Sequence, residues 1–555
     1  MRLDELLMRI VSGPDRGPRA VALAVVLLLG LPLLLFCVAA LLNAGSIFES
    51  SARFVLPFAL RDTVMLSFGV ACATAVIGAG LASIVTYLDF PGVRFIRLAA
   101  ILPLAFPAYL IAYILVDIDR PSSTLERASL VPWLWDFISI LLPEMRSMPG
   151  AIFIFSSVLF PYVYLATRIA FVAQGGALIE TARSLGRTPF EIYRLILLPL
   201  AIPAIATSVL LVIMETLNDI GASEYLGVRT LAFTIYTTWL NRGDFAAAIQ
   251  LSLFLVVAVS ALAFGVQRLS KRLRDAETKR NIGSIVPFHL PRCTSPMLFL
   301  VSALPILFGF ILPALYLMDQ AMIISIRHGA FLSLGQAAFD SLRLAMMAAC
   351  SVIVIAILLL YPHRLHPNHW TQNILRFASY GYAVPGVILG LAILMPFGVI
   401  DNAIDLFATE FLNIKTGLLL SGSAAILIFA YSVRFASVGI TIAGAGYDKI
   451  SRHLDLAARS LGRSRLTSFF LVPTRINHAA ILSAALLVFV DTIKELPLTL
   501  ILRPLGIDTL ATRIYEDASI GQFEQASVKA LVLLAISAIA VIVVIGRQVQ
   551  DTARS

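Results

Sequence analysis

The sequence is poor in charge. Only 14% of its 555 residues are Asp, Glu, Lys or Arg, whereas 59% are hydrophobic. Soluble domains carry roughly 25% charged residues, so a soluble protein of this composition would lack the polar groups to cover its surface. The mean hydropathy of +0.91 favours a lipid bilayer as the surrounding solvent. The net charge of +9 does not indicate nucleic-acid binding, because Lys and Arg stand in short stretches between long apolar runs.

Cysteine is scarce, and phosphate-binding sequences are absent. The four cysteines, Cys37, Cys72, Cys293 and Cys350, form no CxxC pair. This excludes a disulfide framework and a thiolate metal site, and indicates small packing residues. No Gly-x-x-x-x-Gly-Lys-Ser/Thr loop occurs, so we expect no ATP hydrolysis by this chain alone and no bound cofactor.

Three histidines, His363, His366 and His369, stand three residues apart, a spacing that suits a metal. Pro362 and Pro367 argue against a helix there. We therefore expect solvated histidines on a cytoplasmic loop rather than a metal site.

Long apolar runs predict about twelve transmembrane helices, since about 20 mostly apolar residues cross the hydrocarbon core. The first run follows a short basic segment but is longer than the apolar core of a signal peptide, so we interpret it as an uncleaved helix. The predicted spans lie near 20–43, 64–87, 96–117, 149–172, 200–222, 244–266, 297–319, 339–361, 374–399, 416–440, 476–500 and 527–546.

The basic stretches predict the orientation. With twelve spans, the stretches that contain the most Lys and Arg all fall on one side, which the positive-inside rule assigns to the cytoplasm together with both termini. These stretches include Arg2, Arg9, Arg16, Arg19, Arg94, Arg97, Arg183, Arg187, Arg194, Arg268, Lys271, Arg452, Arg459, Arg463 and Arg465. The polar segment 267–296, with Pro287, Pro291 and Pro296, is predicted to be a cytoplasmic linker.

The sequences before and after this linker share an internal repeat. The block Ala182–Arg187 recurs unchanged as Ala458–Arg463, and further matches follow in the same order. These are Glu215–Asp219 with Asp491–Glu495, Thr230–Ala232 and Ile235–Tyr236 with Thr509–Ala511 and Ile514–Tyr515, and Gly243 and Phe245 with Gly521 and Phe523. Six spans separate the copies, so the repeats are parallel and a substrate path is expected between them. We predict an all-α membrane protein with a first half at 1–266 and a second at 297–555.

The first copy contains a recognisable motif. Glu180-Thr181-Ala182, then Gly186, then Ile196, Leu198 and Pro199 resemble the EAA motif of bacterial ABC-importer permeases, with Thr181 in place of the middle Ala. In that family the motif forms a cytoplasmic helix that docks on an ATPase subunit. Gly186 suits a tight turn, Arg183 and Arg187 share one helix face, and Pro199 suits the first turn of the next helix.

The second copy departs from the motif. Ala457, Ala458, Arg459 and Gly462 fit, but Leu456 replaces the acidic residue, and Leu471 and Pro473 come two residues early. We expect this helix to dock with fewer polar contacts.

The resemblance implies a permease of the bacterial inner membrane. Its expected partners are a separate ABC ATPase, in two copies with one on each loop, and an extracytoplasmic substrate-binding protein. An ordinary basic loop is the alternative for either copy alone. An ion-coupled secondary transporter is the alternative of another class, and the paired motifs argue against it.

Acidic groups in the fifth and eleventh spans are candidates for the translocation pathway, because intramembrane charge is costly. They are Glu215, Asp219, Asp491 and Glu495, with Lys494 beside them. Such oxygen ligands suit hard cations. The alternative is that they pair with Lys494, Arg503 or the backbone and hold the bundle together.

Further segments resemble ferric-iron ABC permeases over nearly the whole chain. They are Asp491–Pro497, Leu502–Pro504, Asp508–Arg513, Glu215–Gly227 with Tyr236 and Trp239, and Tyr382–Gly386. The resemblance implies ferric iron as substrate. Permeases for thiamine and for phosphonates are built similarly and stay open as alternatives.

Overall fold

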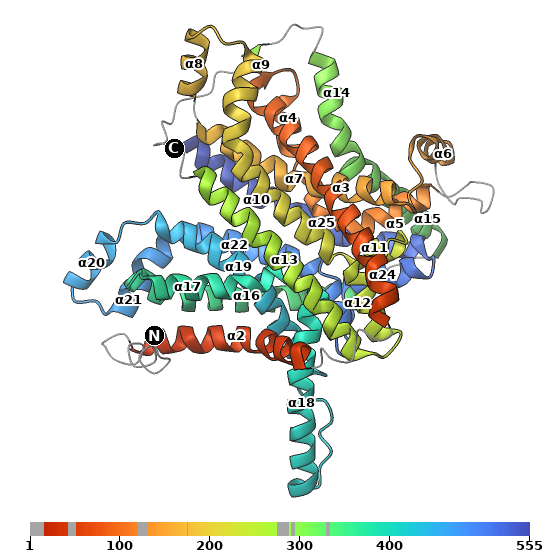
Figure 1. The fold of residues 1–555 in the computed structure, drawn as a ribbon, viewed down its shortest axis with the longest axis vertical. Coiled ribbons are helices and arrows are strands. Elements are labelled where there is room, and N and C mark those ends of the chain that lie inside the picture. Colours follow the sequence, from red (N-terminus) through yellow and green to blue (C-terminus); the bar gives the residue numbers. More distant parts are fainter. Residues whose placement is uncertain are drawn as a thin grey trace. The chain divides into compact units, whose positions relative to one another are not determined.

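The structure of the protein is a computed structural model that describes residues 16–42, 51–119, 131–174, 176–274, 288–289, 295–328 and 334–554. These residues are almost entirely helical (Figure 1). Ten described helices are long and apolar enough to cross a membrane, or twelve if two bent pairs each count as one span. This confirms the predicted all-α membrane fold. Arg2, Arg9, Arg120, Arg127, Pro287, Pro291 and Cys293 lie outside the described residues.

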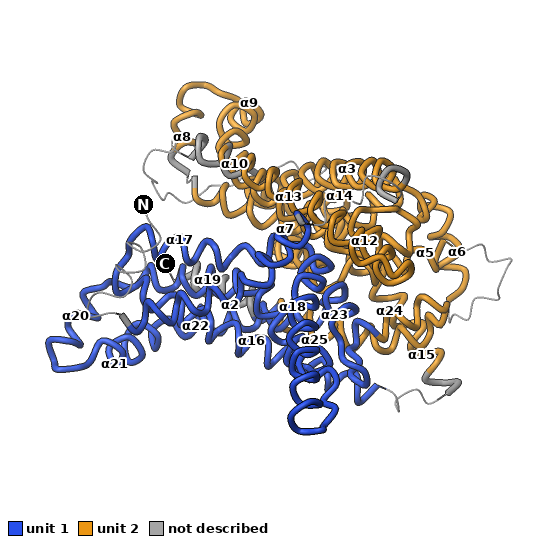
Figure 2. Tube along the Cα trace, turned by 60° about the horizontal axis from the view of Figure 1, so that its bottom comes forward, with its two compact units in different colours: residues 1–46, 333–512, 542–555 blue, residues 47–332, 513–541 orange. Residues whose placement is uncertain are grey.

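The chain forms two compact units (Figure 2). Unit 2 comprises residues 47–332 and 513–541. It contains α3 (Ser51–Tyr87), β1 (Leu88–Asp89), α4 (Val93–Ala99), η1 (Leu102–Ala105), α5 (Ala108–Ile118), α6 (Pro132–Leu141), α7 (Met148–Gln174), α8 (Gly176–Ser184), α9 (Pro189–Ile192), η2 (Tyr193–Leu197), α10 (Leu198–Asn218), α11 (Ile220–Tyr225), α12 (Leu231–Leu240), α13 (Phe245–Arg274), β2 (Phe288–His289), α14 (Ser295–Ile306), η3 (Leu307–Ile311) and α15 (Leu312–His328).

Unit 1 comprises residues 1–46, 333–512 and 542–555. It contains α2 (Arg16–Leu42), α16 (Leu334–Leu365), α17 (His369–Ala378), η4 (Ser379–Ala383), α18 (Gly386–Leu412), α19 (Ala424–Asp448), α20 (His453–Ser460), α21 (Arg465–Phe469), η5 (Phe470–Thr474), α22 (His478–Ile493) and α23 (Pro497–Leu502). Two of the boundaries between the units fall within α24 (Leu510–Ser519) and α25 (Phe523–Arg554).

The units do not coincide with the two halves of the sequence. The first helix of each half packs with the other half: α2 contacts α16, α17 and α18 in unit 1, and α14 to α15 contact α3, α4, α5 and α7 in unit 2. The division into halves at 1–266 and 297–555 therefore stays a prediction that rests on the sequence repeat. Within the predicted linker 267–296, α13 continues to Arg274, α14 begins at Ser295, and the two residues of β2 pair in parallel with β1.

Glycines allow the first helices of the two halves, α2 and the run α14 to α15, to pack closely on their neighbours. A Cβ on Gly309 would lie 2.2 Å from the Ser157 carbonyl oxygen of α7, and a Cβ on Gly30 of α2 would lie 2.5 Å from the Phe377 ring. Small residues bring helix backbones together in membranes, where dispersion contacts supply much of the packing energy. The sequence gives no periodic signal for either contact.

The third span of each half is broken at a proline. Helix α4 and η1 lead to Phe106-Pro107 before α5, with a bend of 94°, and α17 and η4 lead to Val384-Pro385 before α18. Phe106 and Val384 are both extended, with ψ of 134° and 125°, because proline disfavours a helical residue before it. The predicted continuous helices at 96–117 and 374–399 are therefore wrong at these breaks.

The fifth span of each half also ends earlier than predicted. Helix α10 stops at Asn218 and α11 follows, whereas α22 stops at Ile493 and α23 follows. The predictions 200–222 and 476–500 ran through both breaks, although polar residues stand there: Asn218 and Asp219 at the first, Lys494 and Glu495 at the second. The expectation that Pro362 argues against a helix is wrong, because Pro362 lies within α16.

Candidate coupling site

The first EAA-like segment forms a helix that ends in a glycine turn. Helix α8 carries Glu180, Ala182 and Arg183. Gly186 follows with φ +76°. The Gly186 amide donates to the Arg183 carbonyl at 2.9 Å, and the Arg187 amide donates to the Ala182 carbonyl at 3.1 Å. This is the Schellman motif, and its left-handed position favours glycine because other residues are strained there.

After this turn, two reciprocal hydrogen bonds cap the start of the next helix. The Thr188 hydroxyl accepts from the Glu191 amide at 3.3 Å, and the Glu191 carboxylate accepts from the Thr188 amide at 2.9 Å. This capping box starts α9. Arg187 lies 3.6 Å from Glu191, an exposed pair that contributes little to stability. The continuous helical run then reaches α10, where Pro199 lies in the first turn.

The second segment repeats this construction. Helix α20 carries Ala457, Ala458 and Arg459, and Gly462 has φ +82°. The Gly462 amide donates to Arg459 at 3.0 Å, and the Arg463 amide donates to Ala458 at 3.3 Å. Ser464 then caps α21 through the Thr467 amide. The two segments therefore share the same turn and the same kind of cap. We call α8–α9 and α20–α21 the coupling loops.

Each coupling loop exposes three large apolar side chains at matching positions, which the sequence reasoning missed; the first pair is Leu178 and Leu454. Leu185 and Phe190 are 76% and 69% exposed, and Leu461 and Leu466 are 84% and 55% exposed. Apolar residues that lie close together and remain exposed suit contact with a protein partner. The identity of Leu185 and Leu461 between the copies was the available signal.

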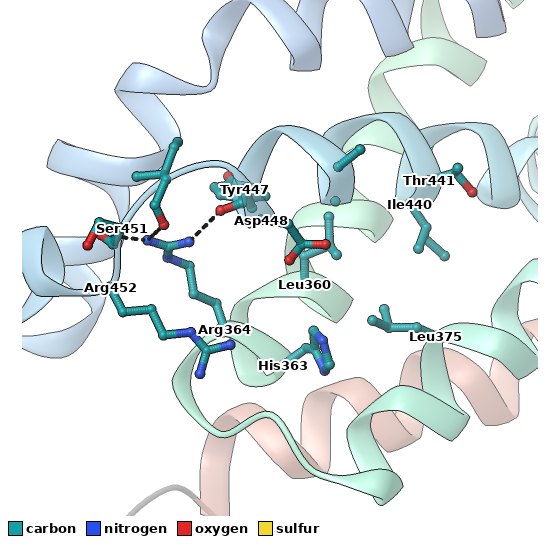
Figure 3. Close-up of a pocket in the computed structure, with 13 residues that line it drawn as sticks. Leu360, His363, Arg364, Leu375, Ile440, Thr441, Tyr447, Asp448, Ser451 and Arg452 are labelled. Carbon is teal, nitrogen blue, oxygen red and sulfur yellow. Dashed lines mark hydrogen bonds between the residues drawn. The ribbon is translucent and has the colours of Figure 1, made fainter. Parts of the chain in front are cut away.

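The second coupling loop is held by a buried arginine (Figure 3). The Arg364 Nε of α16 donates to the Asp455 carboxylate of α20 at 2.8 Å, and the same guanidinium donates to the Tyr447 carbonyl at 2.7 Å and the Ile450 carbonyl at 3.2 Å. Ser468 donates to the Asp455 carbonyl at 3.1 Å. Beside Arg364 lies a cavity of about 450 Å³, with His363 and Arg452 among its lining residues. These bonds tie α20 to the ends of α16 and α19.

The two loops continue differently into the membrane helices. Pro473 lies inside the π-helical turn η5, and the chain bends by 79° between Thr474 and His478. Residues 189–218 instead form one helical run that is long and apolar enough to cross a membrane. Asn477 fills the second bend: its amide donates to the Pro473 carbonyl at 2.8 Å, and its side chain donates to the Ala443 carbonyl at 2.9 Å.

Two of the predicted pathway acids cap short helices. Asp219 accepts from the Ala222 amide at 2.8 Å at the start of α11. Glu495 is buried and accepts from the Leu498 and Thr499 amides, both at 3.1 Å, at the start of α23. Glu495 also lies 4.0 Å from Arg434. These contacts are of the kind that the bundle-holding alternative predicts.

The other predicted pathway groups lie in the preceding helices. Asp491 and Lys494 pair at 3.0 Å at the end of α22. Glu215 is half-buried in the last turn of α10. Their role in a pathway stays a prediction. His363 bonds Thr371 at 2.9 Å, and the described residues contain no group of three His, Cys, Asp or Glu side chains placed to hold a metal ion.

The sequence profile of the family described as "Binding-protein-dependent transport system inner membrane component" matches residues 74–275, which include the first coupling loop. This part of the chain is thus similar to the inner-membrane permeases of ABC importers. The proteins that the chain resembles are transport components and not enzymes, and the ATPase of their systems is a separate subunit. Permeases of this family work with that ATPase and a substrate-binding protein, and are multi-pass inner-membrane proteins.

Individual relatives extend the likeness to the whole permease. The Fe(3+)-transport system permease protein FbpB 2 of Haemophilus influenzae is 24% identical over 95% of this chain and 98% of its own length. The probable ABC transporter permease protein y4fN of Sinorhizobium fredii is 22% identical over 95% of both chains. The putative 2-aminoethylphosphonate permease protein PhnU of Salmonella typhi is 26% identical over 40% of this chain and 75% of its own length.

Proposed function

We propose that this permease imports ferric iron into the cytoplasm, driven by ATP hydrolysis in a separate subunit. The main support is the full-length similarity to a permease named for Fe(3+) transport, together with two coupling loops of the same construction. The phosphonate permease is similar over 40% of this chain, so phosphonate is the competing substrate. Thiamine is the other alternative.

Each coupling loop docks one ATPase subunit in this proposal, which gives two copies per permease. The loops expose matching apolar residues beside a rigid glycine turn. A rigid helix seated in a partner transmits the movement of that partner to the helices that follow it. Both coupling loops and both termini then face the cytoplasm, in accord with the positive-inside rule.

The test measures uptake of labelled ferric citrate by cells that carry the permease with its partners. Unlabelled 2-aminoethylphosphonate and thiamine serve as competitors, and ATP depletion is compared with an uncoupler of the proton gradient. We expect ATP-dependent uptake that neither competitor reduces. Uptake that the uncoupler alone abolishes would instead establish a secondary transporter. Absence of iron uptake alongside saturable phosphonate or thiamine uptake would replace the substrate.

A further inference from the structure

Tyrosines from four elements of unit 2 gather around one carboxylate. Tyr109 and Tyr113 lie on α5, Tyr225 follows Glu224 on α11, Tyr236 lies on α12 and Tyr515 on α24. The rings of Tyr113 and Tyr225 meet edge to face with centroids 4.5 Å apart, and those of Tyr109 and Tyr113 are 5.8 Å apart. We call Tyr113, Glu224, Tyr236 and Tyr515 the tyrosine cluster.

Tyr515 and Glu224 form the polar centre of the tyrosine cluster. The Tyr515 hydroxyl donates to the Glu224 carboxylate at 2.5 Å, and the Tyr236 phenol is a second hydrogen-bond neighbour of Tyr515. Burial raises the pKa of Tyr515, and the adjoining Glu224 raises this pKa further. The polar centre of the tyrosine cluster is thus a phenol hydrogen-bonded to a carboxylate.

The repeat explains why two of these tyrosines meet. Ile235-Tyr236 and Ile514-Tyr515 occupy matching places in the two halves of the sequence. Equivalent residues of a parallel repeat approach each other only near the axis that relates the copies. Substrates of transporters built from such repeats pass at that interface, so the tyrosine cluster stands where a substrate is expected.

The Tyr113 hydroxyl is a buried polar group without a hydrogen-bond partner in the described structure. Tyr113 is only 3% exposed, and its hydroxyl has no hydrogen-bond partner among the described residues. It interacts electrostatically with Tyr515, Glu224 and Asp219. Buried hydroxyls are nearly always bonded, so an unbonded one calls for an explanation. A phenylalanine would fill the same space without a buried polar atom.

The tyrosine cluster lies across the membrane from the first coupling loop. Helix α10 separates the loop from α11 with 21 residues, which span about 31 Å at the α-helical rise. Figure 1 shows α8 and α11 at opposite ends of this unit. An importer receives its substrate on the side away from its ATPase. The position therefore suits reception of substrate.

We propose that the tyrosine cluster is a receiving site for ferric iron, with Glu224, Tyr515 and Tyr113 as oxygen ligands. This inference rests on the proposed function. Carboxylate and phenolate oxygens are hard donors, and tyrosinate is an established ligand of iron. Each of the two phenols releases its proton to water as its bond to iron forms, without any change in oxidation state. One carboxylate and two phenolates balance the charge of Fe³⁺, which reduces the penalty of burying the ion.

An anionic substrate would use a different neighbour. The exposed Arg146 places its guanidinium 5.1 Å from the centre of the Tyr225 ring, and it is the cation next to the tyrosine cluster. A phosphonate would approach Arg146 and be repelled by Glu224. Substitutions at Arg146 and at Glu224 therefore separate the two kinds of substrate.

The direct test adds ferric citrate to the purified full-length permease and records visible absorption, where phenolate-to-iron charge transfer appears. We expect a band in the wild type, its loss in Tyr515→Phe and Glu224→Gln, and a weaker band in Tyr113→Phe. Tyr380→Phe is the matched control, because Tyr380 is an exposed tyrosine in unit 1. Tyr113→Phe should not lower the melting temperature, since its hydroxyl bonds nothing in the described structure.

Uptake of labelled ferric citrate in cells completes the test. The three cluster variants should lose about tenfold or more of the uptake, as losses in metal sites do, while Arg146→Gln and Tyr380→Phe retain it. Wild-type iron uptake with equal uptake in the cluster variants and no band would overturn the tyrosine cluster alone. Absence of iron uptake by the wild type would overturn the proposed function itself. Loss in Arg146→Gln with full activity of Glu224→Gln would indicate an anionic substrate.

Discussion

Replacing Gly186 by Asp tests the first coupling loop. Gly186 has φ +76°, and a Cβ added there would meet no atom within 4 Å. The substitution therefore introduces no clash, and its cost is the backbone strain of about 1–2 kcal/mol for a left-handed L-residue. That strain acts on the turn that orients α8, and reduces the population of the docking conformation by roughly 5- to 30-fold. The added carboxylate also places a charge on the surface that meets the ATPase.

We expect Gly186→Asp to abolish ATP-driven uptake while its amount in the membrane stays at the wild-type level. Gly265→Ala is the control, because Gly265 lies in α13 with open space around it and an ordinary helical φ; alanine there should be neutral or slightly stabilising. Gly462→Asp should be milder than Gly186→Asp, since Arg364 and Ser468 hold the second loop by further bonds. Normal uptake by Gly186→Asp would refute the coupling role, and equal losses at both glycines would refute the asymmetry.

Four further substitutions probe the loops and the packing. Leu185→Asp and Leu461→Asp should each weaken ATPase binding by about 2 kcal/mol, roughly 30-fold, as loss of an interface anchor does. Binding of the purified ATPase measures this affinity. An unchanged affinity would exclude these leucines from the ATPase interface. Arg364→Leu should destabilise the protein by about 3 kcal/mol because it leaves Asp455 without its partner; a melting temperature equal to that of the wild type would contradict this. Gly309→Val should lower the melting temperature, at a cost of about 1–3 kcal/mol or more, because its Cβ would lie 2.2 Å from a carbonyl oxygen; unchanged melting would show that this helix contact yields easily.

Hydropathy predicted most of the helices, and the repeated motif predicted the glycine turn at Gly186. The apolar runs are long enough to mark the spans, and Gly186 and Gly462 need a left-handed turn that local sequence specifies. Hydropathy did not predict the breaks at Pro107 and Pro385, although proline chemistry supplied a signal for both. It also missed the end of α10 at Asn218, although Asp219 directly after it is a residue type that caps a new helix.

Contacts between distant segments were beyond the sequence. Nothing in the apolar run of α2 specifies that it packs on α16 to α18, since lipid-facing and helix-facing residues are equally apolar. The tyrosine cluster brings together Tyr113, Glu224 and Tyr515, which lie up to 402 positions apart in the chain. The repeat paired Tyr236 with Tyr515 but gave no indication that their side chains meet.

Uptake of labelled ferric iron by cells that lack this gene, with and without the gene restored, tests the central claim most directly. The account predicts that restoring the gene restores ATP-dependent iron uptake. Uptake that remains at the level of the gene-deficient cells after the protein has reached the membrane would contradict ferric iron as the substrate.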